Sequence, residues 1–393
     1  MTSTRRNLLC IYVCLFSVML GVGLIVPVLP FQVRRFDTRA ATFGAFMATW
    51  PLVQLMVAPA WGRLADRWGR RSIFLMGMLG FVISFALYYQ AQNLPTLFVA
   101  RIVSGVLSSA TFPIAVAMIA DLTTPTQRPA AMGAMGASIA VGMIVGPAVG
   151  GTLGEAHYQT TFLLATLSTL VGLGVGVLGL QETLPTGDRI PQVEPLSLTP
   201  ALISHPQLSF FGLSFVVSFV MSVFESVAGP FGADMYHLGT RQLGMLFAVM
   251  GLMAALGQGV VLSRLVHHLG EVRVVWLGAL LAGIGFAMVA VTGPVGVLTG
   301  AVGIFGAGFG LLDPSVGHLV TRTAAHGSRG AAVGIQQWFD SLGRIVGSLG
   351  GGFLYQYHPS IPWWVGAGVI VIYVGATRRT MGRQLTLRTE SSR

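Results

Sequence analysis

Residues 142–151 read GMIVGPAVGG, and residues 343–352 read GRIVGSLGGG. A shift of 201 residues superimposes the glycines of the two stretches, and the same shift aligns widely separated positions elsewhere. Chance matching in a glycine-rich chain would not keep one register so well, so the chain is predicted to be an internal duplication. The aligned pairs are Gly142/Gly343, Gly146/Gly347, Gly150/Gly351, Gly151/Gly352, Gly105/Gly306, Pro113/Pro314, Arg128/Arg329, Gly133/Gly334, Arg63/Arg264, Leu64/Leu265 and Gly69/Gly270.

The composition excludes most soluble classes. Of the 393 residues, 53% are hydrophobic and only 9% are charged, and the mean hydropathy is +0.75. A soluble domain carries about 25% charged residues, so disordered, fibrous and ordinary cytosolic proteins are excluded. A spanning helix needs about 20 apolar residues, and this length allows about a dozen of them.

The apolar runs predict twelve spanning helices. The first run, 8–29, follows Arg5 and Arg6. It is too long for a signal-peptide core, and no small-residue cleavage site follows, so we expect a retained helix. The other runs lie near 40–60, 73–91, 95–120, 130–153, 159–180, 207–235, 241–262, 272–292, 294–320, 331–355 and 358–378.

A break at 181–206 separates the two halves. It holds five prolines among charged residues, which is typical of an extended linker. We therefore predict an all-α membrane protein with twelve transmembrane helices in two pseudo-symmetric six-helix bundles. The bundles are residues 1–180 and 207–393, joined by a cytoplasmic linker, 181–206, and ending in a short cytoplasmic tail. Parallel six-helix repeats with a substrate site between them are a transporter architecture.

The arginine distribution predicts the orientation. With twelve helices, both termini and the even-numbered loops share one side, and that side holds seventeen arginines against four on the other. Positive loops face the cytoplasm, so both termini are predicted to be cytoplasmic in an inner-membrane protein. The cluster Arg34, Arg35 and Arg39 is a minor contrary signal.

Several functions lack support in the sequence. The net charge of +10 comes from arginines in short loops, which argues against nucleic-acid binding. Cys10 and Cys14 share one apolar helix, and the histidines are scattered, so no metal site is predicted. The chain has no phosphate-binding loop and no long soluble loop, so neither an enzyme nor a cofactor is expected. The expected partners are a small-molecule substrate, protons and the lipid bilayer, and the chain is expected to act as a monomer.

Residues 62–71 read GRLADRWGRR and follow the second helix. Gly62 and Gly69 would permit a tight turn and close helix approach, and Asp66 could pair with an arginine or cap the next helix. This string resembles the signature loop of the major facilitator superfamily. Its second-half counterpart, RLVHHLG at 264–270, is degenerate, with His267 in the acidic position, and His267–His268 is not read as a metal site.

The stretch 142–151 also resembles a known signature. Glycines four apart let helices pack closely, and Pro147 can kink the helix. The string is similar to the antiporter signature of the twelve-helix drug/proton antiporter family, carried by Gly142, Gly146, Pro147, Gly150 and Gly151. A packing stripe with no influence on direction is the alternative interpretation, and the resemblance favours export.

Other segments resemble the tetracycline/proton antiporters and their multidrug relatives. They are GVGLIVPVLP at 21–30, Gln54 with Pro59, ARIVSG at 100–105 and ADLT at 120–123. The resemblance covers both halves and is stronger in the first. One position departs from the family: Val18 stands where those antiporters often carry an acid. This departure argues against tetracycline as substrate and requires another carboxylate for proton coupling.

Ionisable groups inside spanning helices are functional candidates by default. The resemblance links Arg101 to proton coupling, although a structural arginine is the alternative. Glu225 shares a helix face with serines, and Asp313 precedes Pro314. The eleventh run carries one polar stripe, in which Asp340 and Arg344 could pair, either for coupling or only to shape the cavity. The stripe is Gln337, Asp340, Ser341, Arg344 and Ser348; the predicted cavity residues are Gln54, Gln337, Ser341 and Ser222.

The signature loop and the end of the fourth helix predict a cytoplasmic latch. Asp66, Arg67 and Arg70 should meet Asp121, which closes the fourth helix. The full predicted latch is Gly62, Asp66, Arg67, Gly69, Arg70, Arg71 and Asp121. Together these features predict a secondary transporter that exports small amphipathic compounds or drugs by proton exchange. A proton-coupled symporter or facilitator for a small polar metabolite, and a non-transporting membrane receptor, are the alternatives.

Overall fold

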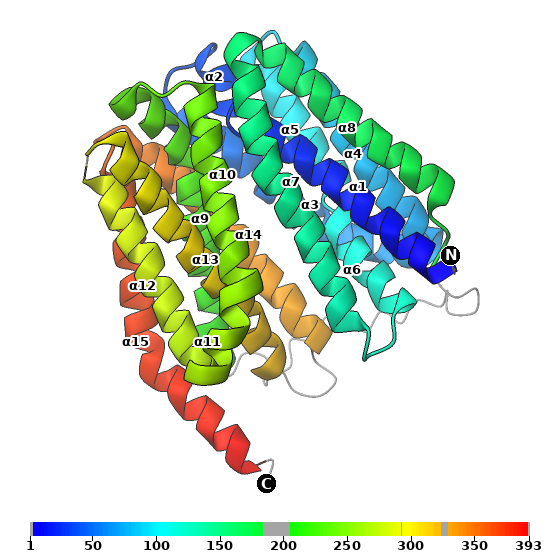
Figure 1. Cartoon of the computed structure of the whole chain (residues 1–393), viewed down its shortest axis with the longest axis vertical. Coiled ribbons are helices and arrows are strands. Elements are labelled where there is room, and N and C mark those ends of the chain that lie inside the picture. Colours follow the sequence, from blue (N-terminus) through cyan, green and yellow to red (C-terminus); the bar gives the residue numbers. More distant parts are fainter. Residues whose placement is uncertain (1–2, 184–204, 292, 324–328, 392–393) are drawn as a thin grey trace. The chain divides into compact units, whose positions relative to one another are not determined.

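The computed structural model describes residues 3–183, 205–291, 293–323 and 329–391, and these form helices and short connections without a strand (Figure 1). The first half contains α1 (Ser3–Ile25), α2 (Leu29–Arg34), α3 (Ala40–Trp68), α4 (Arg70–Gln90), α5 (Leu94–Ser108), α6 (Thr111–Leu122), α7 (Arg128–Ala156) and α8 (Tyr158–Gly179). The second contains α9 (His205–Tyr236), α10 (Thr240–Leu256), a π-helical segment (Gly257–Val261), α11 (Leu262–Leu269), α12 (Glu271–Ala290), α13 (Val295–Thr323), α14 (Arg329–Tyr355) and α15 (Ile361–Ser391).

The all-α membrane fold predicted from the sequence is confirmed. In the described residues, ten helical segments are long and apolar enough to span a membrane. Two more helices complete the twelve: α14, which carries Asp340 and Arg344, and α15, whose apolar part is Ile361–Thr377. Most of the predicted linker, residues 184–204, lies outside the described part of the chain.

The helices group into two compact units. Unit 1 contains Met1–Thr38, Thr49–Val193 and Leu238–Ala248, and unit 2 contains Arg39–Ala48, Glu194–His237 and Val249–Arg393. The beginning of α3 therefore packs with unit 2, and the beginning of α10 packs with unit 1. The 201-residue shift places Arg39–Ala48 almost onto Leu238–Ala248. The two segments that group with the opposite unit are therefore equivalent in the internal repeat.

Corresponding helices pack together in both units. In unit 1, α1 packs on α7 and α8, and α4 packs on α5 and α8. Figure 1 shows α1, in dark blue, running alongside α7 and α8. In unit 2, α9 packs on α14 and α15, and α12 packs on α13 and α15, which are the same pairs after the shift. The repeat seen in the sequence is therefore a repeat of helix packing.

The glycine stripes form close helix contacts in both units. A Cβ atom added to Gly146 would lie 2.7 Å from Cα of Gly23 on α1, and one added to Gly142 would lie 2.8 Å from Cβ of Met19. In unit 2, a Cβ on Gly347 would lie 3.0 Å from Cβ of Ser222 on α9. Small residues at these positions let the helix backbones approach each other. The stripe is thus a packing contact in both units.

Two spanning segments contain irregularities. The fourth is interrupted at Ser109–Ala110, between α5 and α6. Pro113 contributes to this break, because a proline has no N–H for the carbonyl four residues earlier and its ring clashes with that carbonyl. Its counterpart Pro314 lies inside the continuous α13. The eighth contains the π-helical turn Gly257–Val261, and a Cβ on Gly257 would lie 2.9 Å from the Ala307 carbonyl oxygen.

Aromatic side chains fill the core of unit 2. Trp363 of α15 is buried and lies edge-on to three phenylalanine rings, with centroids 5.1 Å from Phe286, 5.3 Å from Phe231 and 6.1 Å from Phe224. Such pairs add about 0.5–1.5 kcal/mol each beyond their burial. This cluster fills the core of unit 2 beside α9, whose Ser218 and Ser222 bond to side chains of α14.

Candidate functional site

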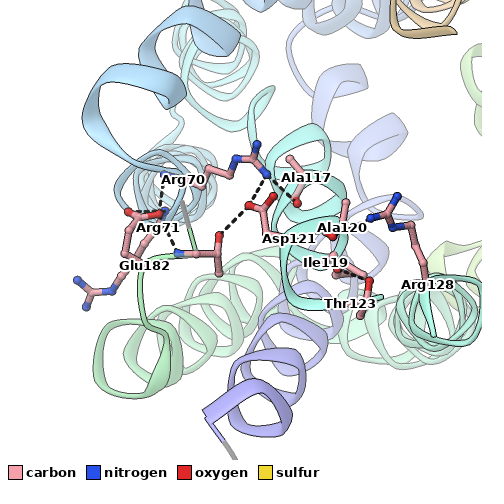
Figure 2. Close-up of polar contacts among 10 residues, drawn as sticks. Arg70, Arg71, Ala117, Ile119, Ala120, Asp121, Thr123, Arg128 and Glu182 are labelled. Atoms are coloured by element: carbon pink, nitrogen blue, oxygen red, sulfur yellow. Dashed lines mark hydrogen bonds and ion pairs between the residues drawn. The ribbon is translucent and has the colours of Figure 1, made fainter. Parts of the chain in front are cut away.

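An ion pair joins the beginning of α4 to the end of α6 in unit 1. The Arg70 guanidinium pairs with the Asp121 carboxylate, and its Nη1 also donates to the Ala117 carbonyl oxygen at 2.8 Å (Figure 2). Both side chains are partly buried. Arg70 thus fastens the signature loop to the last turn of the fourth spanning segment.

Glu182 caps α4 from a distant part of the chain. Its carboxylate accepts hydrogen bonds from the backbone N–H groups of Arg70 at 3.1 Å and Arg71 at 3.3 Å (Figure 2). Gly69, which precedes α4, has φ +90°, and a Cβ there would collide with this carboxylate. Helix N-termini leave unpaired N–H groups and attract negative charge. Glycine at position 69 therefore provides both the turn and the room for the cap.

Further hydrogen bonds connect this network to neighbouring helices. Nη2 of Arg71 donates to the Val177 carbonyl oxygen at 2.8 Å, near the end of α8. Nη2 of Arg128, the first residue of α7, donates to the Ala120 carbonyl oxygen at 3.0 Å. Thr183 donates from its hydroxyl to Asp121 at 3.3 Å. The network therefore links the ends of α4, α6, α7 and α8.

The other predicted latch residues differ in their placement. Arg67 is exposed in the last turn of α3, and the Asp66 side chain lies outside the described residues. Gly62 lies within α3, where a Cβ would meet open space, and its part in the latch stays a prediction. Glu182 was missed because its partners are backbone amides, which leave no mark in the sequence.

Three ionisable side chains gather in unit 2 within spanning helices. Ser218 of α9 donates from its hydroxyl to Oδ1 of Asp340 on α14 at 3.2 Å. Asp340 also lies within electrostatic range of Asp313 on α13 and of Arg344 one turn further along α14. Among the described side chains, no ion pair joins Asp340 to Arg344, so the predicted pair is not formed in this structure. Asp340 contacts α9 instead.

Two more predicted charged residues lie apart from this group. Glu225 is half-buried on α9, two turns beyond Ser218. Arg101 is half-buried on α5 in unit 1, beside the hydroxyl of the buried Tyr88 on α4. Neither residue belongs to the Asp313–Asp340–Arg344 group.

The predicted cavity residues have different environments. Gln54 is half-buried on α3, Gln337 is exposed on α14, and Ser341 donates to the Gln337 carbonyl oxygen at 2.9 Å. Ser222 is only 2% exposed, and its hydroxyl forms a 2.9 Å hydrogen bond with that of Ser348. The Ser222 hydroxyl therefore joins α9 to α14, and its place in a substrate cavity stays a prediction.

The part of the chain that the structure describes contains no group of three His, Cys, Asp or Glu side chains that could hold a metal ion. The described polar clusters instead combine arginine, carboxylate and hydroxyl groups. Such groups can exchange ion-pair partners or a proton when helices move.

Comparisons with known proteins agree along nearly the whole chain. A family model described as the Major Facilitator Superfamily matches residues 11–347. Multidrug resistance protein 1 of Bacillus subtilis (strain 168) is 27% identical over 368 residues, which cover 92% of this chain and 93% of that protein. The class C tetracycline resistance protein of Escherichia coli is 30% identical over 378 residues, with 91% and 93% covered. The quinolone resistance protein NorA of Staphylococcus aureus (strain COL) is 23% identical over 384 residues, with 95% and 98% covered.

Solved structures share the fold at lower identity. The human organic anion transporter MFSD10 has a TM-score of 0.72 at 20% identity, covering 94% of this chain and 98% of that one. The nucleoside transporter NupG has a TM-score of 0.74 at 13% identity, covering 98% and 99%. These proteins carry chemically different substrates, so the shared fold alone does not select one.

Proposed function

The chain belongs to the major facilitator superfamily, and we propose that it exports small amphipathic compounds from the cytoplasm in exchange for protons. Its relatives of similar length are named for resistance to multiple drugs, tetracycline and quinolones. These names refer to resistance to small organic drugs. We infer the same substrate class here.

The observation that carries proton coupling is the group of Asp313, Asp340 and Arg344 in the spanning helices of unit 2. A carboxylate is costly in such a place unless it is paired or protonated. Asp340 has a neutral partner, Ser218, at 3.2 Å, and both a like charge and an opposite charge within range. A proton or a cationic substrate can therefore each compensate its charge.

Competition between proton and substrate at one carboxylate would give antiport. Protonation of Asp340 from outside would release a bound compound, and proton release to the cytoplasm would restore the charge. Glu225 is the second candidate carrier, because α1 has no acidic residue. The two six-helix bundles, residues 1–180 and 207–393, would alternate access as a monomer in the inner membrane, with both termini cytoplasmic.

The glycine stripe of α7 is compatible with the exchange mechanism, although the stripe itself binds no proton. Its contacts with the α1 backbone leave no room for larger side chains, and we expect α1 and α7 to move together. Pro147 lies inside α7 and weakens its backbone hydrogen bonding. A close-packed but bendable contact of this kind suits an alternating mechanism.

The test is transport by the purified protein in proteoliposomes. A panel containing tetracycline, a quinolone, lipophilic cations and polar metabolites is assayed with and without a pH gradient. We expect uphill movement of amphipathic compounds only when protons flow in the opposite direction. Uphill movement of a polar metabolite in the same direction as protons would indicate a symporter instead, and no movement of any compound would favour a receptor.

Variants then identify the proton carrier. Asp340→Asn and Glu225→Gln are made singly and together. The single variants should each reduce uphill export, and the double variant should abolish it while downhill counterflow of substrate remains. Uphill export by the double variant would contradict this mechanism and would direct attention to Asp313.

A further inference from the structure

A second ion-paired cluster lies in unit 2, where α12 begins. Oε1 of Glu271, the first residue of α12, lies 3.0 Å from Nδ1 of His318, and Oε2 lies 2.8 Å from Nη1 of Arg322. His318 and Arg322 are one turn apart on α13. The Glu271 side chain is 11% exposed, whereas those of His318 and Arg322 are 62% and 45% exposed. A largely buried carboxylate is thus held by two basic groups.

The internal repeat superimposes this cluster on the Arg70–Asp121 ion pair of unit 1. The 201-residue shift that aligns the glycine stripes also aligns the acidic and basic members of the two ion pairs, with every charge reversed. The preceding glycines share a positive φ, +90° and +79°. The corresponding residues are Gly69/Gly270, Arg70/Glu271, Ala117/His318 and Asp121/Arg322.

The reversal changes how each pair fits its helices. A helix carries partial positive charge at its N-terminus and partial negative charge at its C-terminus. In unit 2, Glu271 begins α12 and Arg322 lies in the last turn of α13, so both charges have the favourable sign. In unit 1, Arg70 begins α4 and Asp121 ends α6, so both have the unfavourable sign.

In unit 1, two further charged groups lie at these helix ends. Glu182 caps α4 at the residue where Arg70 stands, and Arg128 binds the Ala120 carbonyl oxygen at the end of α6. The pair in unit 2 is already aligned with its helix dipoles, and it has a third member, His318, in the place of Ala117. The Arg70–Asp121 and Glu271–Arg322 pairs therefore occupy equivalent positions, but different neighbouring charged groups stabilise them.

We propose that Glu271, His318 and Arg322 form a second latch, and that His318 makes its strength depend on pH at that membrane face. An imidazole changes its charge between about pH 5 and 8. When His318 is protonated, Glu271 binds two cations, and when it is neutral, Arg322 is the remaining cation. The latch is therefore tighter at acidic pH and looser as pH rises.

The charged and titratable groups around His318 are few. Arg322 lies on α13 itself, Glu271 and Arg273 lie on α12, and α11 carries Arg264, His267 and His268. The side chains of His205 and Arg329, which begin α9 and α14, lie outside the described residues. Among the described groups, Glu271 is the one within ion-pair distance of His318.

The consequence for transport rests on the proposed function. The arginine distribution predicts that α12 begins at the cytoplasmic face. Proton exchange would bring protons to that face, where they would protonate His318 and tighten the latch. The cluster would then slow the cycle when the cytoplasm becomes acidic.

Hydrogen exchange of the full-length protein in lipid nanodiscs tests the latch without transport. Protection of the first turn of α12 is measured at about pH 5.5 and about pH 7.5, either side of the imidazole titration, and is corrected for the intrinsic exchange rate. We expect protection to be greater at the lower pH by on the order of two- to fivefold, the range of exposed ion pairs.

Variants matched to the repeat separate the contributions. His318→Ala installs the residue found at position 117 and should remove the pH dependence. His268→Ala, at an exposed histidine that ends α11, should keep it. Pairing Glu271→Arg with Arg322→Asp reproduces the polarity of unit 1 and should restore part of the protection that Glu271→Arg alone removes.

The proposal would be overturned if protection of the α12 N-terminus still depended on pH in His318→Ala, or did not depend on pH in the unchanged protein. A failure of the double exchange to restore any protection would also overturn it. These readouts do not depend on a substrate, so a protein that transports none of the tested compounds would refute the proposed function and leave the latch standing.

Discussion

Replacing Gly146 with alanine should weaken unit 1, whereas the same change at Gly136 should not. The new Cβ at position 146 would lie 2.7 Å from Gly23 Cα, 2.8 Å from Gly23 C and 2.9 Å from the Leu20 carbonyl oxygen. Carbon atoms prefer about 3.5–4.0 Å, so α1 must move by roughly 1 Å. At Gly136, on the same helix, a Cβ would meet nothing within 4 Å.

The difference between the two variants isolates the packing cost. Alanine is favoured over glycine in a helix by about 1 kcal/mol at either position, and this gain cancels in the comparison. Overpacking costs about 1–3 kcal/mol. The free energy of unfolding should therefore be about 1–3 kcal/mol lower for Gly146→Ala than for Gly136→Ala.

Unfolding by SDS in mixed micelles, followed by circular dichroism, measures this difference. Gly347→Ala and Gly350→Ala form the matched pair in unit 2, because a Cβ at Gly347 would lie 3.0 Å from Ser222 Cβ while one at Gly350 would meet open space. If Gly146→Ala and Gly136→Ala unfold with equal free energies, the α1–α7 contact is not as close as the structure indicates.

Three further predictions concern the Arg70 network and the orientation. Glu182→Ala should lower the free energy of unfolding by about 0.5–2 kcal/mol, as loss of a helix cap does, and should increase hydrogen exchange at Arg70 and Arg71 while leaving α12 unchanged. Arg70→Gln and Asp66→Asn should each slow transport in proteoliposomes without lowering expression, and unchanged rates in both would contradict the predicted latch. A cysteine placed at Thr2 or at Ser392 should react with impermeant reagents only in inside-out vesicles, and labelling from outside the cell would reverse the topology.

The sequence predicted the spanning helices because their signal is strong and local. Ten of the segments satisfy length and hydropathy alone, and the apolar runs at 331–355 and 358–378 complete the twelve. The break before α6 was not predicted, because the run 95–120 indicated one helix, and Pro314, the counterpart of Pro113, lies inside the continuous α13. The π-helical turn at Gly257 was not predicted either, because it depends on how closely α10 packs on α13.

The candidate site was predictable where side chains pair with side chains. Arg70 and Asp121 stand at helix ends that consecutive antiparallel helices bring together, so charge and position sufficed. A cavity role for Ser222 does not follow from its position alone, because a serine on a polar helix face can bond a neighbouring helix as readily as line a cavity. Only packing distances separate these two roles.

The second cluster could have been found from the repeat. The shift that aligned the glycines also carries Arg70 onto Glu271 and Asp121 onto Arg322. Matching identical residues between the loops 62–71 and 264–270 instead placed His267 at the acidic position, because this match takes no account of reversed charges. Complementary pairs can exchange their polarity while their geometry stays the same, so a search for identical residues overlooks them.

The opposite polarity of the two pairs leads to a last prediction. Arg70 and Asp121 stand against their helix dipoles, so their pair depends on Glu182 at the beginning of the predicted linker. In the double variant Arg70→Glu with Asp121→Arg, the polarity of unit 2 is installed, and the acid at position 70 would itself favour the α4 N-terminus. Glu182→Ala should then cost close to nothing, compared with about 0.5–2 kcal/mol in the unchanged background. Equal losses in the two backgrounds would mean that Glu182 acts through its backbone hydrogen bonds alone, independently of the charge at position 70. A larger loss in the unchanged background would identify Glu182 as the residue that stabilises the Arg70–Asp121 pair.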